Sequence, residues 1–401
     1  MNKNPIIVVA LAGLTLLTAG CGASNNAGSG GPAGEPIKIV SIIETDGPPG
    51  TPDFREGAVA INAAVKAVNA AGGIKGRPLR AKVCADKNNV NTAVQCARNA
   101  VSDRAVAVVG SFGQYGSQYL PILEAPGIPA VAPYAGVFEA KHASAYPIIG
   151  GNLGGPTGGV AVLADVARAK NITIAYVDVA SAAAAVKQAI PVLAARGVAA
   201  PRMVPVPAGA PDMSSYAAAV LQNKPDGVYI AMAPADIDKL IMAIRQTGSK
   251  VAISRSGTSL SGTSLTTLGP AAEGILINAQ FPPNSSSNPA IQEFITAMKA
   301  EDPSASLSDT AKNSWAAVML FKQAAERATS IDPAGIKAAL DSNTFDLKLL
   351  PEVQFKTPNP AVGADFPRAF NTRVTYLKVQ GGELVSANND QFIDPFSKPT
   401  A

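Results

Sequence analysis

Residues 105–136 read AVAVVGSFGQYGSQYLPILEAPGIPAVAPYAG, and this stretch decides the fold. An apolar run, Ala105–Val109, ends in a glycine-rich turn, and a short helical pattern leads to a second apolar run, Ile128–Val131, and to a tight turn at Ala132–Gly136. Continuous apolar runs joined by helices are typical of parallel strands covered on both faces. Ligands of such sheets bind beyond the carboxyl ends of the strands. Both turns are predicted at such ends, where they form either a ligand site or two ordinary strand-to-helix turns.

The same alternation continues toward the N-terminus. A helix near Phe54–Val68 is predicted to have Thr51 as its N-cap and Pro52 at its first position, and a second helix is predicted to begin with a capping box at Thr92. Strands are predicted at Ile37–Ile43 and Leu79–Cys84. This order of strands and helices predicts an α/β fold with a doubly wound parallel sheet.

A second strand-helix series follows a glycine-rich segment, NLGGPTGG at Asn152–Gly159, which we interpret as a boundary between domains. Strands are predicted at Ile172–Val177, Met203–Val206, Gly227–Met232, Val251–Ser254 and Gly274–Phe281, with a hairpin at Val374–Val379 and Glu383–Val385. Helices are predicted near Ala182–Arg196, Ser214–Gln222, Ala235–Thr247, Pro289–Ala300, Thr310–Thr329 and Pro333–Leu340. Two doubly wound lobes are therefore expected.

Residues 1–21 have the features of a signal peptide. Lys3 gives a positive start, and the apolar core Ile6–Thr18 is too short to span a bilayer comfortably. Leu17–Cys21 resembles the lipobox of bacterial lipoproteins, which implies that Cys21 is acylated and anchors the exported chain to the outer face of the cell membrane. A plain signal peptide cleaved nearby is the alternative. Residues 22–36, rich in Gly, Ser, Asn and Pro, are predicted to form a flexible tether.

The composition limits the possible partners. The chain has 401 residues, enough for two domains, and a formal net charge of +4. No long basic stripe occurs in the sequence, so nucleic acid is not expected as a partner. No cofactor or metal is expected, because the only histidine, His142, lies in a polar segment and is predicted at the surface.

Cysteine usage is consistent with export. Once Cys21 is assigned to the leader, Cys84 and Cys96 remain as an even pair. Cys84 ends a predicted strand and Cys96 lies in the following helix, so the two can face each other. A disulfide between them is predicted.

A second motif lies between the first two predicted strands. Residues 68–77 read VNAAGGIKGR, which is similar to the INAAGGINGR segment of type I periplasmic binding proteins, and more narrowly to the branched-chain amino-acid binding family of ABC importers. Asp46–Pro48, Gly127–Pro133 and Ser314–Ala328 fit the same pattern. The resemblance implies two lobes joined by a three-crossover hinge that close on a solute, with a membrane permease as partner. Lobe 1 would comprise residues 37–152 and 282–366, and lobe 2 residues 153–281 and 367–390.

The ligand residues that the family implies depart from its pattern in this chain. Gln114 or a neighbour stands where the family has a hydroxyl, and Gly136 stands for its threonine. Ser181 begins the segment that replaces the family's Tyr-Gly pair. The loop Ser254–Ser259, where an acid usually pairs with the ammonium group, holds Arg255 and no acid. The set of residues that would hold an amino acid is therefore incomplete, and an amino-acid-like solute stays open beside other small organic molecules.

A solute without a zwitterion is predicted instead, such as an aromatic or aliphatic carboxylate or a neutral organic molecule. Arg255 would pair with a carboxylate, although a solvated loop position is the alternative. The aromatic residues of the turns would stack on an apolar body or serve only as core packing. The candidate ligand-binding residues are Asp46, Phe54, Ser111, Phe112, Gln114, Tyr115, Tyr134, Ala135, Gly136, Ser181, Met232 and Arg255.

The sequence also bears on two other classes of function, an enzyme and a sensor. An enzyme is not expected, because the sequence has neither the Gly-x-Ser-x-Gly elbow of a serine hydrolase nor the spacing of a phosphate loop. A lipid-anchored sensor that presents its solute to a receptor would share the same two-lobed trap, and it stays as the alternative to an importer component. The chain is expected to act as a monomer.

Overall fold

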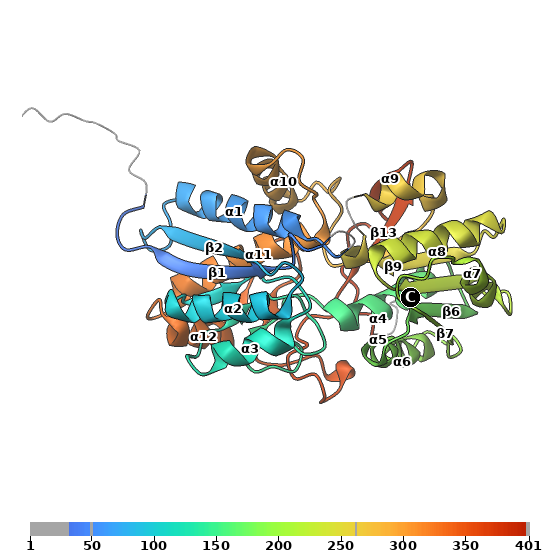
Figure 1. Ribbon diagram of the computed structural model, residues 1–401, viewed down its shortest axis with the longest axis horizontal. Helices are drawn as coiled ribbons and strands as arrows, with labels where there is room; N and C mark the ends of the chain where they lie inside the picture. Colours follow the sequence, from blue (N-terminus) through green and yellow to red (C-terminus); the bar gives the residue numbers. More distant parts are fainter. Residues whose placement is uncertain (1–31, 49–50, 261–262, 398–401) are drawn as a thin grey trace, which may run out of the picture. The chain divides into compact units, whose positions relative to one another are not determined.

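The computed structural model describes residues 32–48, 51–260 and 263–397. The predicted leader, most of the tether and Cys21 lie outside the described residues. Within the described part, the strands form two larger sheets and one short pair, β11 (Thr344–Phe345) with β12 (Val353–Gln354). The chain is thus α/β with two lobes built on mainly parallel sheets, as the sequence predicts (Figure 1).

The first sheet has the strand order β2-β1-β3-β4-β5, and all of its neighbouring strands are parallel. Its strands are β1 (Ile37–Ile43), β2 (Leu79–Ala85), β3 (Ala107–Val109), β4 (Ala130–Val131) and β5 (Ala145–Tyr146). The helices around it are α1 (Arg55–Ala70), α2 (Val90–Ser102), α3 (Gly116–Glu124), α10 (Pro289–Glu301), α11 (Asp309–Arg327) and α12 (Pro333–Ser342). Helices from the last third of the chain therefore complete a lobe that the first third begins.

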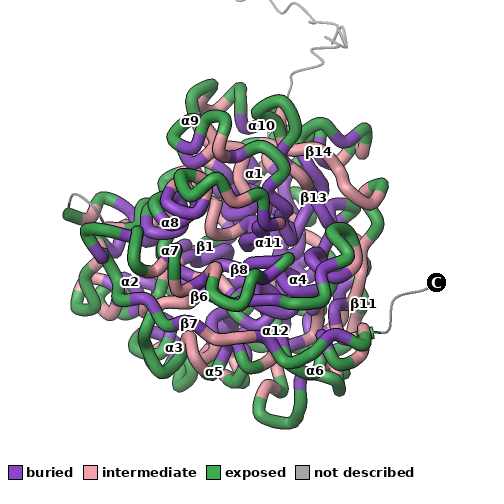
Figure 2. The backbone as a smooth tube through the Cα atoms, turned by 90° about the vertical axis from the view of Figure 1, so that its right-hand side faces the viewer, coloured by how far each residue is buried: buried purple, intermediate pink, exposed green. Residues whose placement is uncertain are grey.

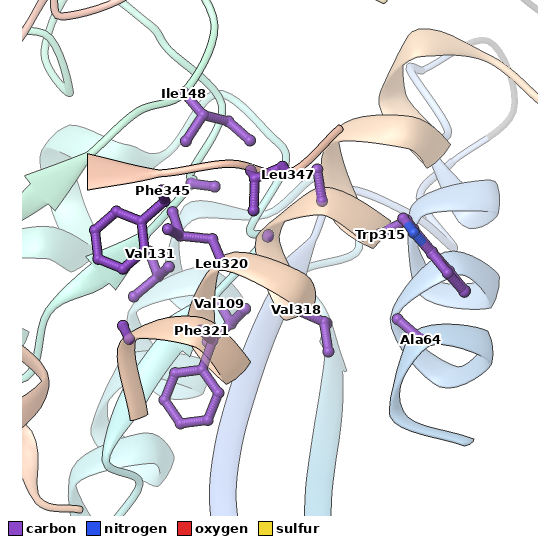
Figure 3. Close-up of a cluster of buried hydrophobic side chains, with 14 of the residues drawn as sticks. Ala64, Val109, Val131, Ile148, Trp315, Val318, Leu320, Phe321, Phe345 and Leu347 are labelled. Carbon is purple, nitrogen blue, oxygen red and sulfur yellow. The ribbon is translucent and has the colours of Figure 1, made fainter. Parts of the chain in front are cut away.

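Helix α11 forms the centre of this lobe's core. Figure 3 shows Trp315 beside Ala64 of α1, while Leu320 and Phe321 lie near Val109 and Val131 of the sheet. Most of the helix is buried, including its polar first turn. Figure 2 shows the same contrast in the whole fold, because α11 and the strands are mostly purple while the outer helices carry green segments. Burial of apolar side chains on both faces of the sheet stabilises this arrangement.

The second sheet has the order β14-β13-β10-β9-β8-β6-β7. Its strands are β6 (Ile172–Val177), β7 (Arg202–Val206), β8 (Gly227–Ala231), β9 (Ala252–Ser256), β10 (Leu276–Ala279), β13 (Thr375–Gln380) and β14 (Glu383–Ser386). Only the hairpin β13-β14 runs antiparallel to its neighbours. The surrounding helices are α4 (Gly151–Asp165), α5 (Ala180–Val186), α6 (Ala189–Ala194), α7 (Ser214–Leu221), α8 (Pro234–Gln246) and α9 (Ser264–Leu268), with short 3₁₀ turns η1 (Gly257–Ser259), η2 (Gly269–Ala272) and, after β12, η3 (Pro360–Val362).

The chain passes between the two lobes in three places: at α4, after β10 and before β13. This path agrees with a three-crossover hinge, while the residue limits of the lobes remain a prediction. No helix of the described residues has the length and apolarity needed to cross a membrane.

The glycine-rich segment Asn152–Gly159, near which the sequence predicts a boundary between domains, is helical and forms the first half of helix α4. The helix was not predicted, because glycine lowers helix propensity in isolation, whereas here tertiary packing stabilises it. A Cβ at Gly159 would lie 2.1 Å from the ring of Tyr229, and one at Gly158 would lie 2.8 Å from the Asn278 amide. Glycine thus lets α4 approach the second sheet closely.

Two predicted helix caps and one surface position were also wrong. Helix α1 is preceded by Phe54 rather than Thr51, and α2 begins after Asn89, whose side chain accepts bonds from the N–H groups of Asn91 and Thr92. His142 is only 11 % exposed at its side chain, because it packs against Phe138. The sequence therefore predicted the type of these elements better than the residues at which they begin.

The disulfide between Cys84 and Cys96 is present, with the two Cα atoms 5.9 Å apart. It joins the end of β2 to the middle of α2. The predicted pairing is confirmed, and it ties the first helical layer to an edge strand next to the carboxyl end of β1.

Candidate functional site

A cavity of about 300 Å³ lies where the two lobes face each other, and we call it the inner chamber. Its lining comprises Phe54, Tyr134, Val137, Gly151, Asn152, Gly155, Pro156, Val177, Ser181, Ala182, Ala185, Val186, Tyr229, Ile230, Ala231, Met232, Pro234, Ser256, Thr258 and Ser259. A smaller cavity of about 240 Å³, the side chamber, is lined by Glu44, Pro52, Phe54, Phe112, Gly113, Gln114, Tyr134, Asn152 and Thr258. Four residues line both chambers, so the two adjoin.

The lobe 1 wall is built from the carboxyl ends of its strands. The N–H of Phe112 bonds to Ile42 O at 3.0 Å, and the N–H of Glu44 bonds to Phe112 O at 2.8 Å, which continues the pairing of β1 with the segment after β3. The ring of Phe112 lies 4.8 Å from that of Phe54 and 4.6 Å from that of Tyr134. These three rings form an aromatic surface beside both chambers.

The lobe 2 wall combines apolar side chains with hydroxyl groups. Tyr229 on β8 is buried against α4, and burial raises the pKa of its phenol, so it stays neutral. The hydroxyl groups of Ser256 and Thr258 lie 2.9 Å apart at the start of η1. Ser181 and Met232 complete the wall from α5 and from the end of β8. This wall offers neutral hydrogen-bonding groups on an apolar surface.

Among the described residues, Glu44 is the one carboxylate that lines either chamber, and none of the lining residues is Lys, Arg or His. It is 2 % exposed, and its Oε1 accepts a bond of 2.7 Å from Gln114 Nε2. Burial, with a contribution from the charge of Asp86, raises the pKa of Glu44 to about 7. Burial likewise raises the pKa of Asp86 to about 6. Both chambers are therefore free of positive charge.

The same order of strands and lobes occurs in known proteins. The sequence profile of a family described as periplasmic binding protein matches residues 36–366. This chain belongs to that family. It is therefore a binding protein rather than an enzyme, and its class acts outside the cytoplasm. No curated protein matches the chain significantly in sequence.

Three solved structures illustrate the likeness of this periplasmic binding protein to others. A leucine-binding protein of Thermotoga maritima shares 18% identity over 90% of this chain and 99% of its own, with a TM-score of 0.70. A fatty acid ABC transporter substrate-binding protein of Thermomonospora curvata shares 19% over 91% and 94%, with a TM-score of 0.72. A branched-chain amino acid binding protein of Streptococcus pneumoniae, in complex with isoleucine, shares 15% over 87% and 98%, with a TM-score of 0.70. At these identities the likeness shows the fold.

Arg255 does not line either chamber, contrary to the prediction for this periplasmic binding protein. Its guanidinium is fully buried and pairs with Asp238 of α8, and it also donates to the carbonyl of Ser259. Asp238 in turn accepts a bond of 2.8 Å from the Ser264 hydroxyl. Arg255 lies within β9 and points into the core, where a buried acid on the neighbouring helix satisfies it.

Five of the other eleven predicted ligand residues also lie away from the chambers. Ser111 is buried and accepts the N–H of Ile42 at 3.0 Å, while the hydroxyl of Tyr115 donates to Asn88 O at 2.9 Å. Asp46 is exposed at the turn after β1. Ala135 and Gly136 lie behind Tyr134, and a Cβ at Gly136 would come 2.3 Å from Glu139 Oε2. Glu139 thus fills the space that the family's threonine would take.

Six predicted residues do line the chambers, and their contact with a ligand stays a prediction. They are Phe54, Phe112, Gln114, Tyr134, Ser181 and Met232. Sequence reasoning missed Glu44, Asn152, Tyr229, Ser256 and Thr258. For Glu44 a signal existed, because it directly follows the apolar strand Ile37–Ile43. No sequence signal marked Tyr229, because it lies inside a strand. Its ring has room beside the chamber only because the residues of α4 that pack against it are glycines.

Proposed function

We propose that this periplasmic binding protein captures a small organic solute in the inner and side chambers and delivers it to the permease of an ABC importer. The observation that carries the proposal is the lining of the inner chamber, which comes from both lobes. A solute that touches both walls stabilises the arrangement in which the lobes are together, by the difference in its affinity for the two states. A permease can then distinguish loaded from empty protein.

The lining also favours a class of solute. A buried carboxylate needs a cation or a dense set of donors, because an unpaired buried charge is very costly. Neither chamber offers a cation, and Arg255 is already paired. An aliphatic or aromatic body without a carboxylate therefore suits the chambers, whereas a zwitterionic amino acid does not. This narrows the solute predicted from the sequence to one that lacks an acid.

The importer role is supported by the names of the structures with this fold. Two of them are described as binding proteins of branched-chain amino acids or leucine, and another as the substrate-binding protein of a fatty acid ABC transporter. The solutes in those names differ widely, so the solute of this chain follows from its own chambers. A sensor that presents the same solute to a receptor would be encoded away from permease and ATPase genes.

We further propose that Cys21 is acylated and holds the protein at the outer face of the cell membrane, with residues 22–36 as the tether. The support is the lipobox-like ending of the leader. The variant Cys21→Ser should leave the membrane fraction or fail to be processed. Unchanged processing and fractionation would contradict the anchor without affecting the solute proposal.

A thermal-shift screen against a library of small organic solutes tests the binding role. We expect stabilisation by solutes with an apolar body and without a carboxylate. Ala182→Trp fills the inner chamber from α5 and should abolish that stabilisation. Ala184→Trp, on the same helix but exposed and outside the lining, is the matched control. If hits stabilise both variants equally, the solute binds elsewhere and the proposal fails.

A further inference from the structure

The two chambers carry a one-sided set of charges. In the part of the chain that the structure describes, their combined lining contains one carboxylate, Glu44, and no Lys, Arg or His. Asp86 stands directly behind it at 2 % exposure. A solute that enters the side chamber therefore meets negative charge alone. Such a wall repels an anion and attracts a cation more strongly than the same charges would in water.

The strand register fixes this acidic pair. β1 and β2 run parallel with Ile43 opposite Ala85, so Glu44 and Asp86 are the next residues of two adjacent strands. The N–H of Asp86 bonds to Ile43 O at 2.9 Å. A Cβ at Gly113 would lie 3.3 Å from Asp86 Oδ2 and 3.4 Å from Glu44 Oε2, so both oxygens adjoin one point at the edge of the side chamber.

Each of the two carboxylates has one oxygen engaged in a side-chain hydrogen bond. Glu44 Oε1 accepts from Gln114, and Asp86 Oδ1 accepts the N–H of Asn88 at 2.8 Å. The backbone N–H of Gln114 also contributes to the bonding of the Glu44 carboxyl, and no side-chain donor to Glu44 Oε2 occurs among the described residues. Because Glu44 lines the side chamber, a donor from the solute can bond to its carboxylate there.

Aromatic rings surround the same position. Phe54, Phe112 and Tyr134 line the side chamber together with Glu44. The face of an aromatic ring attracts a cation within about 6 Å, most strongly where water is excluded. An ammonium group bound at Glu44 would share the side chamber with these three aromatic rings.

We propose that the side chamber binds the protonated amino group of the solute through Glu44, with Asp86 adding charge from behind, and that the solute is an amine with an apolar body and no carboxylate. This inference rests on the proposed binding role, and it names the class of solute within it. Placing the amino group on the lobe 1 wall leaves the apolar body in the inner chamber, against Tyr229 and Met232.

Binding of such a cation should displace a proton. The groups that face Glu44 are Asp86 at the end of β2, Gln114 and Tyr115 after β3, and Tyr134 after β4, and none of them is a cation. Because the pKa of Glu44 is about 7, its carboxyl is about half protonated at neutral pH. The ammonium group keeps its protons, and the proton of the Glu44 carboxyl passes to the buffer. Up to about half a proton is released for each amine bound at pH near 7.

The test compares matched triples of amine, alcohol and carboxylate on the same body: isoamylamine, isoamyl alcohol and isovalerate, and phenethylamine, phenethyl alcohol and phenylacetate. Affinities are measured by calorimetry on the purified protein, in two buffers of different ionisation enthalpy. We expect the amine to bind most tightly in each triple and to release protons. Glu44→Gln should weaken the amine about 10- to 100-fold, remove the proton release and change the alcohol by less than about threefold.

Glu44→Gln keeps an acceptor for Gln114, so the variant retains the shape of the wall, and Asp86→Asn provides a second probe with a smaller expected loss. Glu326→Gln, at an exposed pair with Lys322 on α11, is the matched control and should leave amine binding unchanged. Alcohols or carboxylates that bind more tightly than the amines, or amine binding unchanged in Glu44→Gln, would overturn this inference while the binding role stands. If no member of any triple and no solute of the library binds, the binding role fails as well.

Discussion

Gly159 of α4 lies against the ring of Tyr229 on β8, where a Cβ would stand 2.1 Å and 2.2 Å from two ring carbons. Gly159→Ala should therefore displace a ring that lines the inner chamber. Overpacking costs about 1–3 kcal/mol, and the gain in helix propensity offsets about 1 kcal/mol of it. We expect unfolding free energy to fall by about 1–2 kcal/mol in urea titrations and solute affinity to fall about tenfold.

Gly155→Ala is the control for stability, because it gains the same helix propensity and its Cβ would lie 3.2 Å from the Tyr229 hydroxyl and 3.7 Å from Ser256 Cβ. Its unfolding free energy should change little. Equal losses in the two variants would show that the glycines matter for helix geometry and not for the approach to Tyr229.

The buried pair of Arg255 and Asp238 is expected to hold the loop that presents Ser256 and Thr258 to the inner chamber. Asp238→Asn leaves a buried cation without its partner, so we expect a loss of about 3–5 kcal/mol in chemical denaturation. The double variant Arg255→Met with Asp238→Leu should lose less than the sum of the single changes.

The selectivity for solutes distinguishes the structural role of Arg255 from a direct contact between Arg255 and the ligand. If Arg255→Met selectively weakened carboxylates while other solutes bound normally, Arg255 would contact the ligand after all. Glu326→Gln provides the exposed comparison, with an expected cost below about 1 kcal/mol.

The comparison of sequence and structure has a physical pattern. Strands such as Ile37–Ile43 were predicted to the residue, because a continuous apolar run is visible in the sequence. Helix α4 was not, because its glycines make sense only against Tyr229. Arg255 was misplaced for the same reason, since its partner Asp238 lies 17 residues earlier on another element. Side chains at strand ends can be predicted from the chain, whereas partners brought together by packing cannot.

Two buried carboxyl groups, those of Glu139 and Glu44, should give the folding stability of the protein an unusual dependence on pH. Burial raises the pKa of Glu139 from 4.5 to about 7, and Glu44 behaves alike. A raised folded-state pKa means that the folded chain holds protons that the unfolded chain releases, so stability falls as pH rises from about 4.5 to about 7 and then levels off. One pKa unit corresponds to about 1.4 kcal/mol, so the ionisation of Glu139 alone should lower the free energy of unfolding by on the order of 3 kcal/mol over this pH range.

Urea midpoints measured from pH 5 to pH 8 check this expectation. Glu139→Gln, whose side chain does not titrate, should flatten the slope. A midpoint that rises steadily with pH over this range, with the same slope in the variant, would contradict the assignment.

The disulfide between Cys84 and Cys96 should contribute about 3 kcal/mol to stability, because it closes a short loop in the unfolded chain. Intact-mass measurement with alkylation, before and after reduction, checks the bond in the exported protein. Urea denaturation of Cys84→Ala with Cys96→Ala measures its contribution. Two thiols that alkylate freely without reductant would rule the bond out.

Calorimetric titrations of the protein with leucine and with isoamylamine are the sharpest test of the proposed solute class. The two molecules share a side chain and an amino group and differ in the carboxylate. We expect isoamylamine to bind and leucine not to bind, since no described residue that lines either chamber is a cation that could pair with the carboxylate of leucine. Micromolar binding of leucine, with isoamylamine weaker or silent, would contradict the account.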